Sequence, residues 1–324
     1  MSDATAPAAP ATIAASHEDG ASEAPTGGIA MVTPSFVGDL PLFSRLHESF
    51  SRFAGPECEH LVVVPRSDKA AFKPFAGPRT RILAMEELFP VPFLKLPGWM
   101  TPLRSGREMY VSWRTIPVRG WIMQQMVKIG AALLTDRDTL LYCDSDVMLV
   151  RPLTANSLGA PDGRLRLFRE KDVTGHLPSH QRWYEAIETL LDVPKASFYG
   201  DNYVQDLITW HRPHALALME RLEQTSGRPW WISLANTLHF SEYMLYGIFC
   251  EHVLGESGCV QTPDDRKLVL TSWDFDLGSP IGQEAFATGL EAHHIGVTVQ
   301  SQSKVPPDLR NALLDRVAAS AQEA

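Results

Sequence analysis

The sequence predicts an α/β fold, with a mostly parallel central sheet flanked by helices. The chain opens with an apolar stretch (28–36), an amphipathic stretch (42–53) and a second apolar stretch (60–65). This is the strand, helix, strand order of a βαβ unit. Further along, the apolar run Leu140–Cys143 stops abruptly at Asp144. Such short runs are typical of strands buried on both faces of a parallel sheet.

Composition and charge exclude several classes of protein. The chain has 324 residues, of which 44% are hydrophobic, enough for a sizeable core. A formal net charge of −9 argues against a nucleic-acid partner, which requires a clustered basic face. No apolar run approaches the roughly 20 residues that a membrane-spanning helix needs. Four cysteines without metal-binding spacing indicate a reducing compartment, so we expect a cytoplasmic protein in which Cys143 and Cys250 are buried.

The first 27 residues differ in composition from the rest of the chain. They are rich in Ala, Pro, Ser and Thr, and they lack the basic start and apolar centre of a signal peptide. We predict a disordered tail over 1–27 and one domain over 28–324. Many prolines between 72 and 117 argue against long regular elements there. Further strands are expected at 164–169, 204–210 and 294–299, and helices at 180–191, 213–224, 238–249 and, a short one, after Pro306.

Helical spacing predicts a helix over 121–134 that leads into the strand before Asp144. Gln124 and Lys128 lie four residues apart and therefore share one face of it. Lys128 has two interpretations, a solvated surface lysine or a contact to a ligand phosphate. Near the start of the chain, Asp39 is a candidate cap for the helix at 42–53.

The segment Asp144-Ser145-Asp146 is the centre of the predicted site. In a doubly wound sheet, ligands bind beyond the carboxyl ends of the strands. Two carboxylates there are suited to Mg²⁺ or Mn²⁺, with substrate phosphates completing the shell. The alternative is a polar turn with two solvated aspartates.

Glu242 is a second candidate. It is the only acid between Ile232 and Phe249, and Ser241 before it is a candidate helix cap. A carboxylate in so apolar a helix is either a partner of the helix dipole or a buried functional group.

Four segments together resemble GT-A type glycosyltransferases, and most closely the DUF6492 family of GT-A-like bacterial proteins. They are 32–39 (Val-Thr-Pro-Ser-Phe-Val-Gly-Asp), 120–128 (Gly-Trp-Ile-Met-Gln-Gln-Met-Val-Lys), the Asp144-Ser145-Asp146 motif with Arg151-Pro152, and 240–247 (Phe-Ser-Glu-Tyr-Met-Leu-Tyr-Gly). They extend over roughly two thirds of the chain, from about residue 28 to residue 255.

The resemblance implies a GT-A-like (Rossmann-like) fold and a hexosyltransferase-like enzyme. Such an enzyme moves a sugar from a nucleotide-sugar donor to an acceptor hydroxyl, on a glycan or a small molecule. Asp144 and Asp146 would hold Mn²⁺ or Mg²⁺, with His294 or its neighbour His293 as a further ligand. The implied donor site consists of Thr33, Pro34, Gln124, Lys128, Asp144 and Ser145.

The chemistry of glycosyl transfer is compatible with this implication. Charge builds on the departing diphosphate, and a metal with a nearby cation stabilises it. Inversion also requires a base for the acceptor hydroxyl, and Glu242 and Asp201 are the candidates. Two alternatives stay open: a nucleotidyltransferase or phosphatase-like metal enzyme, and a catalytically silent GT-A-like module that binds a sugar.

Overall fold

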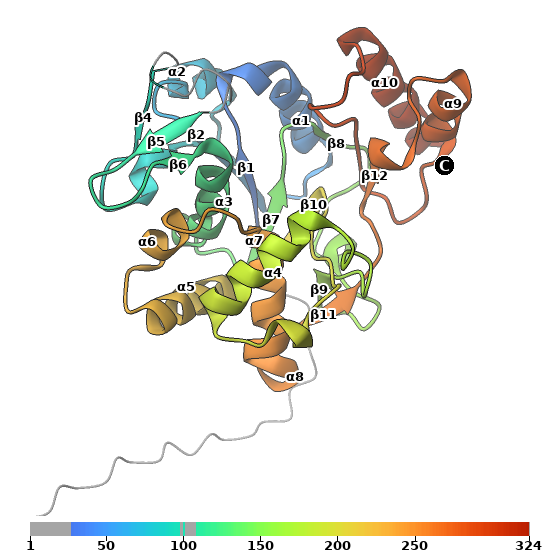
Figure 1. The fold of residues 1–324 in the computed structure, drawn as a ribbon. Coiled ribbons are helices and arrows are strands. Elements are labelled where there is room, and N and C mark those ends of the chain that lie inside the picture. Colours follow the sequence, from blue (N-terminus) through green and yellow to red (C-terminus); the bar gives the residue numbers. More distant parts are fainter. Residues whose placement is uncertain (1–26, 98–99, 101–107, 324) are drawn as a thin grey trace, which may run out of the picture.

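The computed structural model describes residues 27–97, 100 and 108–323. Its central sheet has five strands in the order β10-β7-β1-β2-β3 (Figure 1). The pairs β7–β1, β1–β2 and β2–β3 are parallel, and the edge strand β10 is antiparallel to β7. The prediction of a mostly parallel α/β sheet is confirmed. The strands are β1 (Ile29–Pro34), β2 (Cys58–Val64), β3 (Thr80–Ala84), β7 (Thr139–Cys143) and β10 (Leu207–His211).

Helices cover both faces of this sheet because successive strand side chains point to opposite sides. On β1, Ile29 and Met31 pack into the core beneath α1 (Leu40–Phe53). Ala30 and Val32 belong to the core on the other face. The helices of that second face are α3 (Gly120–Gly130), α4 (Pro178–Leu191), α5 (Arg212–Ser226), α6 (Trp230–Ala235) and α7 (Glu242–Ile248).

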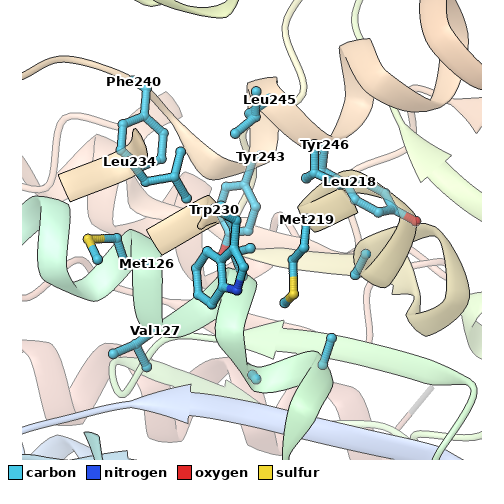
Figure 2. Packing of buried hydrophobic residues seen from close by; sticks show 14 of the residues in the cluster. Met126, Val127, Leu218, Met219, Trp230, Leu234, Phe240, Tyr243, Leu245 and Tyr246 are labelled. Atoms are coloured by element: carbon cyan, nitrogen blue, oxygen red, sulfur yellow. The ribbon is translucent and has the colours of Figure 1, made fainter. Parts of the chain in front are cut away.

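An aromatic side chain fills the space between these helices. Figure 2 shows Trp230 between Met126 of α3 and Met219 of α5, with Tyr243 of α7 close by. All four side chains are buried. This packing fixes α3 and α7 against each other, and both helices contribute residues to the site described below.

The chain leaves the central sheet at Asp144-Ser145-Asp146. The next strand, β8 (Val147–Leu149), pairs instead with β13 (Gly296–Thr298), which also pairs with β12 (Val269–Thr271). A separate core lies between this sheet and two helices near the C-terminus, α9 (Pro280–Thr288) and α10 (Pro307–Glu323) (Figure 1). The motif thus stands where two sheets meet.

The remaining elements are short. A two-stranded sheet pairs β9 (Leu165–Phe168) with β11 (Gln261–Asp264), and a three-stranded sheet contains β4 (Leu94–Lys95), β5 (Met109–Val111) and β6 (Val118–Arg119). The other helices are α2 (Lys69–Phe72), the π-helix Phe249–Leu254 and α8 (Gly255–Gly258). In the described part of the chain no helix is both long and apolar enough to cross a membrane.

Some sequence-based boundaries were wrong. Among its described residues the stretch 72–117 has no long element, but it contributes β3 to the central sheet, which we did not predict. The strand expected from 204 begins only at Leu207, and the helix expected from 238 begins at Glu242. The closing helix α10 has 17 residues and is not short. Apart from Gly27, the predicted disordered tail lies outside the described residues.

Candidate active site

The Asp144-Ser145-Asp146 motif is held against the end of β1. The Ser145 hydroxyl donates a hydrogen bond of 2.8 Å to the Ser35 hydroxyl, and both side chains are buried. The backbone N–H of Val147 donates to the carbonyl of Asp144 and closes a turn. The carboxylates therefore project from a fixed turn at the carboxyl edge of two adjacent parallel strands.

Lys128 lies at the centre of a buried charge cluster. Its Nζ is 3.2 Å from Asp144 Oδ1 and 3.2 Å from Glu242 Oε1. It also donates a hydrogen bond of 2.8 Å to the Tyr243 hydroxyl. The side chain is 6% exposed, so the interpretation of Lys128 as a solvated surface lysine is wrong.

The surroundings keep Lys128 charged. Burial disfavours the ammonium form, but Asp144, Tyr243 and Glu242 together raise the pKa of Lys128 well above its usual value. Of the two carboxylates, Glu242 is 6% exposed and Asp144 is 47% exposed. The lysine thus connects a buried acid to an acid that faces solvent.

Glu242 is fixed at the first turn of α7. Ser241 caps this helix, since its side chain accepts a hydrogen bond from the N–H of Met244, as predicted. The N–H of Glu242 itself donates to the Gln125 side chain of α3 at 2.9 Å. Burial raises the pKa of Glu242, and Lys128 partly opposes this effect. Glu242 is therefore paired with Lys128, which also contacts Asp144.

Two further aspartates join the motif. The antiparallel register places Leu207 of β10 opposite Cys143 of β7, so Asp206 stands beside Asp144. Asp39, the residue before α1, makes no side-chain hydrogen bond to that helix, so the predicted cap was wrong. Burial, together with the charges of Asp144 and Asp146, raises the pKa of both Asp39 and Asp206 to about 6. Burial is the larger cause, and repulsion by Asp144 and Asp146 adds to it in both cases.

Asp206 was not predicted as a site residue because it directly precedes a strand. At the carboxyl edge of a parallel sheet one expects residues that follow strands. Only the antiparallel direction of β10 brings a preceding residue to that edge. The available signal was an acid directly before the apolar run Leu207–Trp210.

The chemistry of these side chains suits a hard divalent cation. Asp206 Oδ2 is buried and has no hydrogen-bond partner, and Asp144 Oδ1 has only its ion pair with Lys128. Oxygen ligands of this kind are what Mg²⁺ and Mn²⁺ take. Among the described residues, however, the aspartates do not present three ligand atoms within 4.8 Å of one another. Such a site therefore depends on ligand phosphates to complete its shell.

His294 does not belong to this site. The register of β13 with β8 pairs Thr298 with Val147 and Gly296 with Leu149, so His294 lies at the far end of β8 from Asp146. Its Nδ1 accepts a hydrogen bond from the N–H of Glu291, and its carbonyl accepts one from Arg151. The residue that reaches Asp146 is Ser301, whose N–H donates to Oδ2 at 2.7 Å. The prediction of His294 as a metal ligand was wrong because it ignored the direction of β13.

A cavity of about 580 Å³ opens beside the motif, between the end of β1 and the start of α3. Pro34 and Gln124, two residues of the predicted donor site, line it together with Ser35, Arg119 and Gln302. Thr33 does not, because its side chain is fully buried and bonded to His60 Nε2 at 2.9 Å. The expectation that Thr33 contacts a ligand was therefore wrong.

Asp201 lies in a different charge cluster. Its Oδ2 pairs with Arg169 at 2.9 Å, and its Oδ1 accepts a hydrogen bond from the N–H of Asp172. Arg169 also pairs with Glu251 at 2.8 Å. Both oxygens of Asp201 are thus engaged in joining three segments of the chain, and the structure does not bring Asp201 to Lys128 or Asp144. This geometry favours Glu242 over Asp201 as the functional acid.

Comparison with known proteins identifies the family to which the chain belongs. The chain belongs to the family described as "Family of unknown function (DUF6492)", whose model matches residues 29–317. Among solved structures it is similar to the galactosyltransferase LgtC in complex with donor and acceptor sugar analogs, at a TM-score of 0.45 and 13% identity. It is also similar to an active-site mutant of LgtC, at 0.46 and 10%. Each likeness covers 90% of this chain and 95% of the other. No curated protein matches.

Proposed function

We propose that this protein is a metal-dependent glycosyltransferase that moves a sugar from a nucleotide-sugar donor to an acceptor hydroxyl. The observation that carries the proposal is the ion-paired cluster of Glu242, Lys128 and Asp144, which stands beside Asp146 and Asp206. The cluster combines a fixed buried cation with a region of excess negative charge. These are the two features needed to bind a diphosphate through a divalent metal.

Asp144 and Asp146 would hold Mn²⁺ or Mg²⁺, with Asp206 as a further oxygen ligand. When bound, the metal would neutralise the negative charge of the diphosphate and favour its departure. The repulsion that adds to burial in raising the pKa values of Asp39 and Asp206 would be relieved at the same time. A bound cation would thus account for the excess of acid groups in the free protein.

The donor would lie in the cavity between β1 and α3. Pro34, Ser35 and Gln124 line this cavity, and the Ser35–Ser145 hydrogen bond connects its wall to the motif. Lys128 lies on α3, as Gln124 does, and its Nζ contacts Asp144. Its role would be to stabilise charge that builds on the leaving diphosphate, which a preorganised cation does well in a partly desolvated site.

Glu242 would position Lys128. Its carboxylate oxygen is engaged with the lysine, and its side chain is 6% exposed. A base must reach the hydroxyl proton that it removes. The geometry therefore favours a positioning role for Glu242 over the role of base that its residue type allows.

The test is hydrolysis and transfer from a panel of nucleotide sugars, with and without Mn²⁺. We expect slow, Mn²⁺-dependent hydrolysis of at least one donor, and its loss in the double variant Asp144→Asn with Asp146→Asn. Release of a sugar 1-phosphate instead of a nucleoside diphosphate would favour the nucleotidyltransferase alternative, and Mn²⁺-dependent release of inorganic phosphate from a phosphomonoester, with no reaction of the nucleotide sugars, would favour the phosphatase alternative. Sugar binding without turnover, unchanged in the double variant, would identify a silent module.

A further inference from the structure

A second group of potential metal ligands lies well away from the carboxylates. Among the described residues, His214, Cys250 and Cys259 are the only set of three His, Cys, Asp or Glu side chains whose ligand atoms all lie within 4.8 Å of one another. All three are buried. We propose that they form a binding site for a soft or borderline d¹⁰ cation such as Zn²⁺.

The site is separate from the proposed active site. Strand β10 begins directly after Asp206, which lies beside Asp144, and ends at His211, which pairs with Thr139 at the opposite edge of the sheet. Five residues of strand span about 16 Å. His214 follows on the first turn of α5. The two sites therefore stand at opposite ends of one strand and share no side chain.

The distances are close to those of a tetrahedral zinc site. Bonds of about 2.3 Å to sulfur and about 2.0 Å to nitrogen place tetrahedral ligand atoms about 3.3–3.8 Å apart. Cys250 Sγ and His214 Nδ1 are already 3.9 Å apart. Movements of about 1 Å or less would close the remaining gaps. Two cysteines and one histidine leave a fourth position for water or another side chain, a known zinc arrangement.

His211 is a candidate for the fourth position. Its ring packs edge-on against that of His214, with 4.4 Å between the ring centroids. Its Nδ1 is buried and has no hydrogen-bond partner. A buried unpartnered nitrogen is costly, and a cation or a water that it orients would satisfy it.

The local backbone brings the two cysteines together although eight residues separate them. Cys250 lies in the π-helix Phe249–Leu254, a rare conformation that often occurs at functional sites. Gly255 then adopts a φ of +67°, which reverses the chain so that Cys259 returns to Cys250. This spacing matches no short zinc motif, so the sequence alone gave no sign of the site.

Two alternatives to a metal site are compatible with the same three residues. In the first, the two thiols and the imidazole are neutral groups that only hydrogen-bond to one another. In the second, the two thiols are a redox pair that oxidises to a Cys250–Cys259 disulfide. Both cysteines are free in the structure. Two sulfur atoms and an imidazole nitrogen, all within 4.8 Å of one another, are the donor set of a metal site, and the experiment distinguishes it from the two alternatives.

The first measurement uses the wild-type protein, purified under reducing conditions and stripped with a chelator. Titration with Co²⁺ should give a thiolate-to-cobalt charge-transfer band that saturates at one ion per chain and is lost on addition of Zn²⁺. X-ray absorption on the zinc-loaded protein should show two sulfur ligands at about 2.3 Å. Absence of the charge-transfer band, or a shell of oxygen and nitrogen alone, would overturn the proposal.

Variants then assign the ligands. Cys250→Ser and Cys259→Ser should each weaken Zn²⁺ binding more than about a hundredfold, since loss of an outer partner alone costs about 10–100-fold. Cys58→Ser is the matched control, because Cys58 is equally buried but bonds only to the carbonyl of Leu153. If the serine variants do not fold, the wild-type spectra still decide.

Two outcomes separate the alternatives. If the reduced protein binds no Co²⁺ and air oxidation lowers its mass by two hydrogens, the cysteines are a redox pair and the proposal of a metal site is wrong. The double variant Asp144→Asn with Asp146→Asn should keep the thiolate–cobalt band, because those carboxylates take no part in it. Loss of the band in that variant would contradict the proposed ligands.

Discussion

At the scale of single residues, Lys128 is the side chain on which the site depends. It is buried between Glu242 and Asp144, and only Asp144 has an exposed side chain. Removing one member of a buried ion pair leaves the other charge without compensation, which is more costly than losing the pair as a whole. If the proposed function holds, a change of Lys128 should therefore affect both stability and donor binding.

Lys128→Met should lower the free energy of unfolding by about 3–5 kcal/mol, because Glu242 then stays buried without a partner. A surface lysine would change it by less than about 0.5 kcal/mol. Denaturant unfolding at neutral pH measures the difference. The double variant Lys128→Met with Glu242→Gln is the control and should regain most of the loss. No recovery in the double variant would mean that the ion pair is not the cause.

Asp206→Asn should have effects of opposite sign on stability and on metal binding. The Asp206 carboxylate is repelled by Asp144 and Asp146, so its neutral isostere should raise the melting temperature of the metal-free protein. The same change removes an oxygen ligand and should weaken Mn²⁺ binding in the presence of a nucleoside diphosphate. Thermal unfolding and calorimetry test the two effects. A variant that loses stability and keeps Mn²⁺ affinity would remove Asp206 from the site.

Glu242→Gln distinguishes a positioning residue from a base. If Glu242 holds Lys128, the variant should bind the donor more weakly and lose less than about a hundredfold in kcat, with an unchanged pH profile. Loss of a general base would cost at least about a hundredfold with donor affinity intact. Steady-state kinetics measured across pH distinguish the two roles. A loss of at least about a hundredfold in kcat with donor affinity intact would identify Glu242 as the base.

At the scale of elements, α7 is held in place by close contact with Tyr203. A Cβ added at Gly247 would lie 2.1 Å from the Tyr203 ring, so this glycine allows the helix to pack directly on the aromatic side chain. The Tyr203 hydroxyl bonds to Glu251 in the π-helix that continues α7. The position of Glu242 at the start of α7 thus depends on a contact further along the same helical segment.

Gly247→Ala should lower stability by about 1–3 kcal/mol through overpacking, despite the better helix propensity of alanine. We also expect weaker donor binding, because a shifted α7 moves Glu242 away from Lys128. Gly77→Ala is the matched control, since a Cβ there meets nothing within 4 Å. Equal stability of the two variants in denaturant unfolding would show that α7 tolerates the displacement.

At the scale of the whole molecule, the carboxylate region makes stability depend on pH and on metal. The folded pKa values of Asp39 and Asp206 are about 6, above the value of 3.8 for free aspartate. The folded state therefore binds more protons than the unfolded state between these values. Ionisation of these groups makes stability fall as pH rises through about 6.

Without metal, the contribution of these two groups to the free energy of unfolding should therefore be lost between about pH 4 and pH 6. In the presence of a nucleoside diphosphate, added Mn²⁺ should raise the melting temperature more at about pH 7 than at about pH 5, where protons compete for the carboxylates. Thermal unfolding with and without Mn²⁺ measures this. Asp206→Asn should show a smaller dependence on pH than the wild type, and equal slopes would refute the assignment.

The sequence by itself determined the fold class and the position of the Asp144-Ser145-Asp146 motif at the end of a strand. Local patterns were sufficient for β1, α1 and β2, because the period of the apolar residues reports which faces are buried. The abrupt end of the apolar run at Asp144 located the carboxyl edge of a strand. Pro34 and Gln124 also lie on the strand and the helix that the local patterns predicted.

Only the tertiary structure decided which distant residues join that centre. The direction of β10 brings Asp206 to Asp144, and the direction of β13 takes His294 away from Asp146. The sequence allowed Lys128 to be a surface residue, but in the folded chain it is buried and pairs with Glu242. Strand direction, register and burial result from packing between segments far apart in the chain. A local sequence pattern does not report such long-range packing. The Cys250–Cys259–His214 cluster could therefore be recognised only in the folded structure.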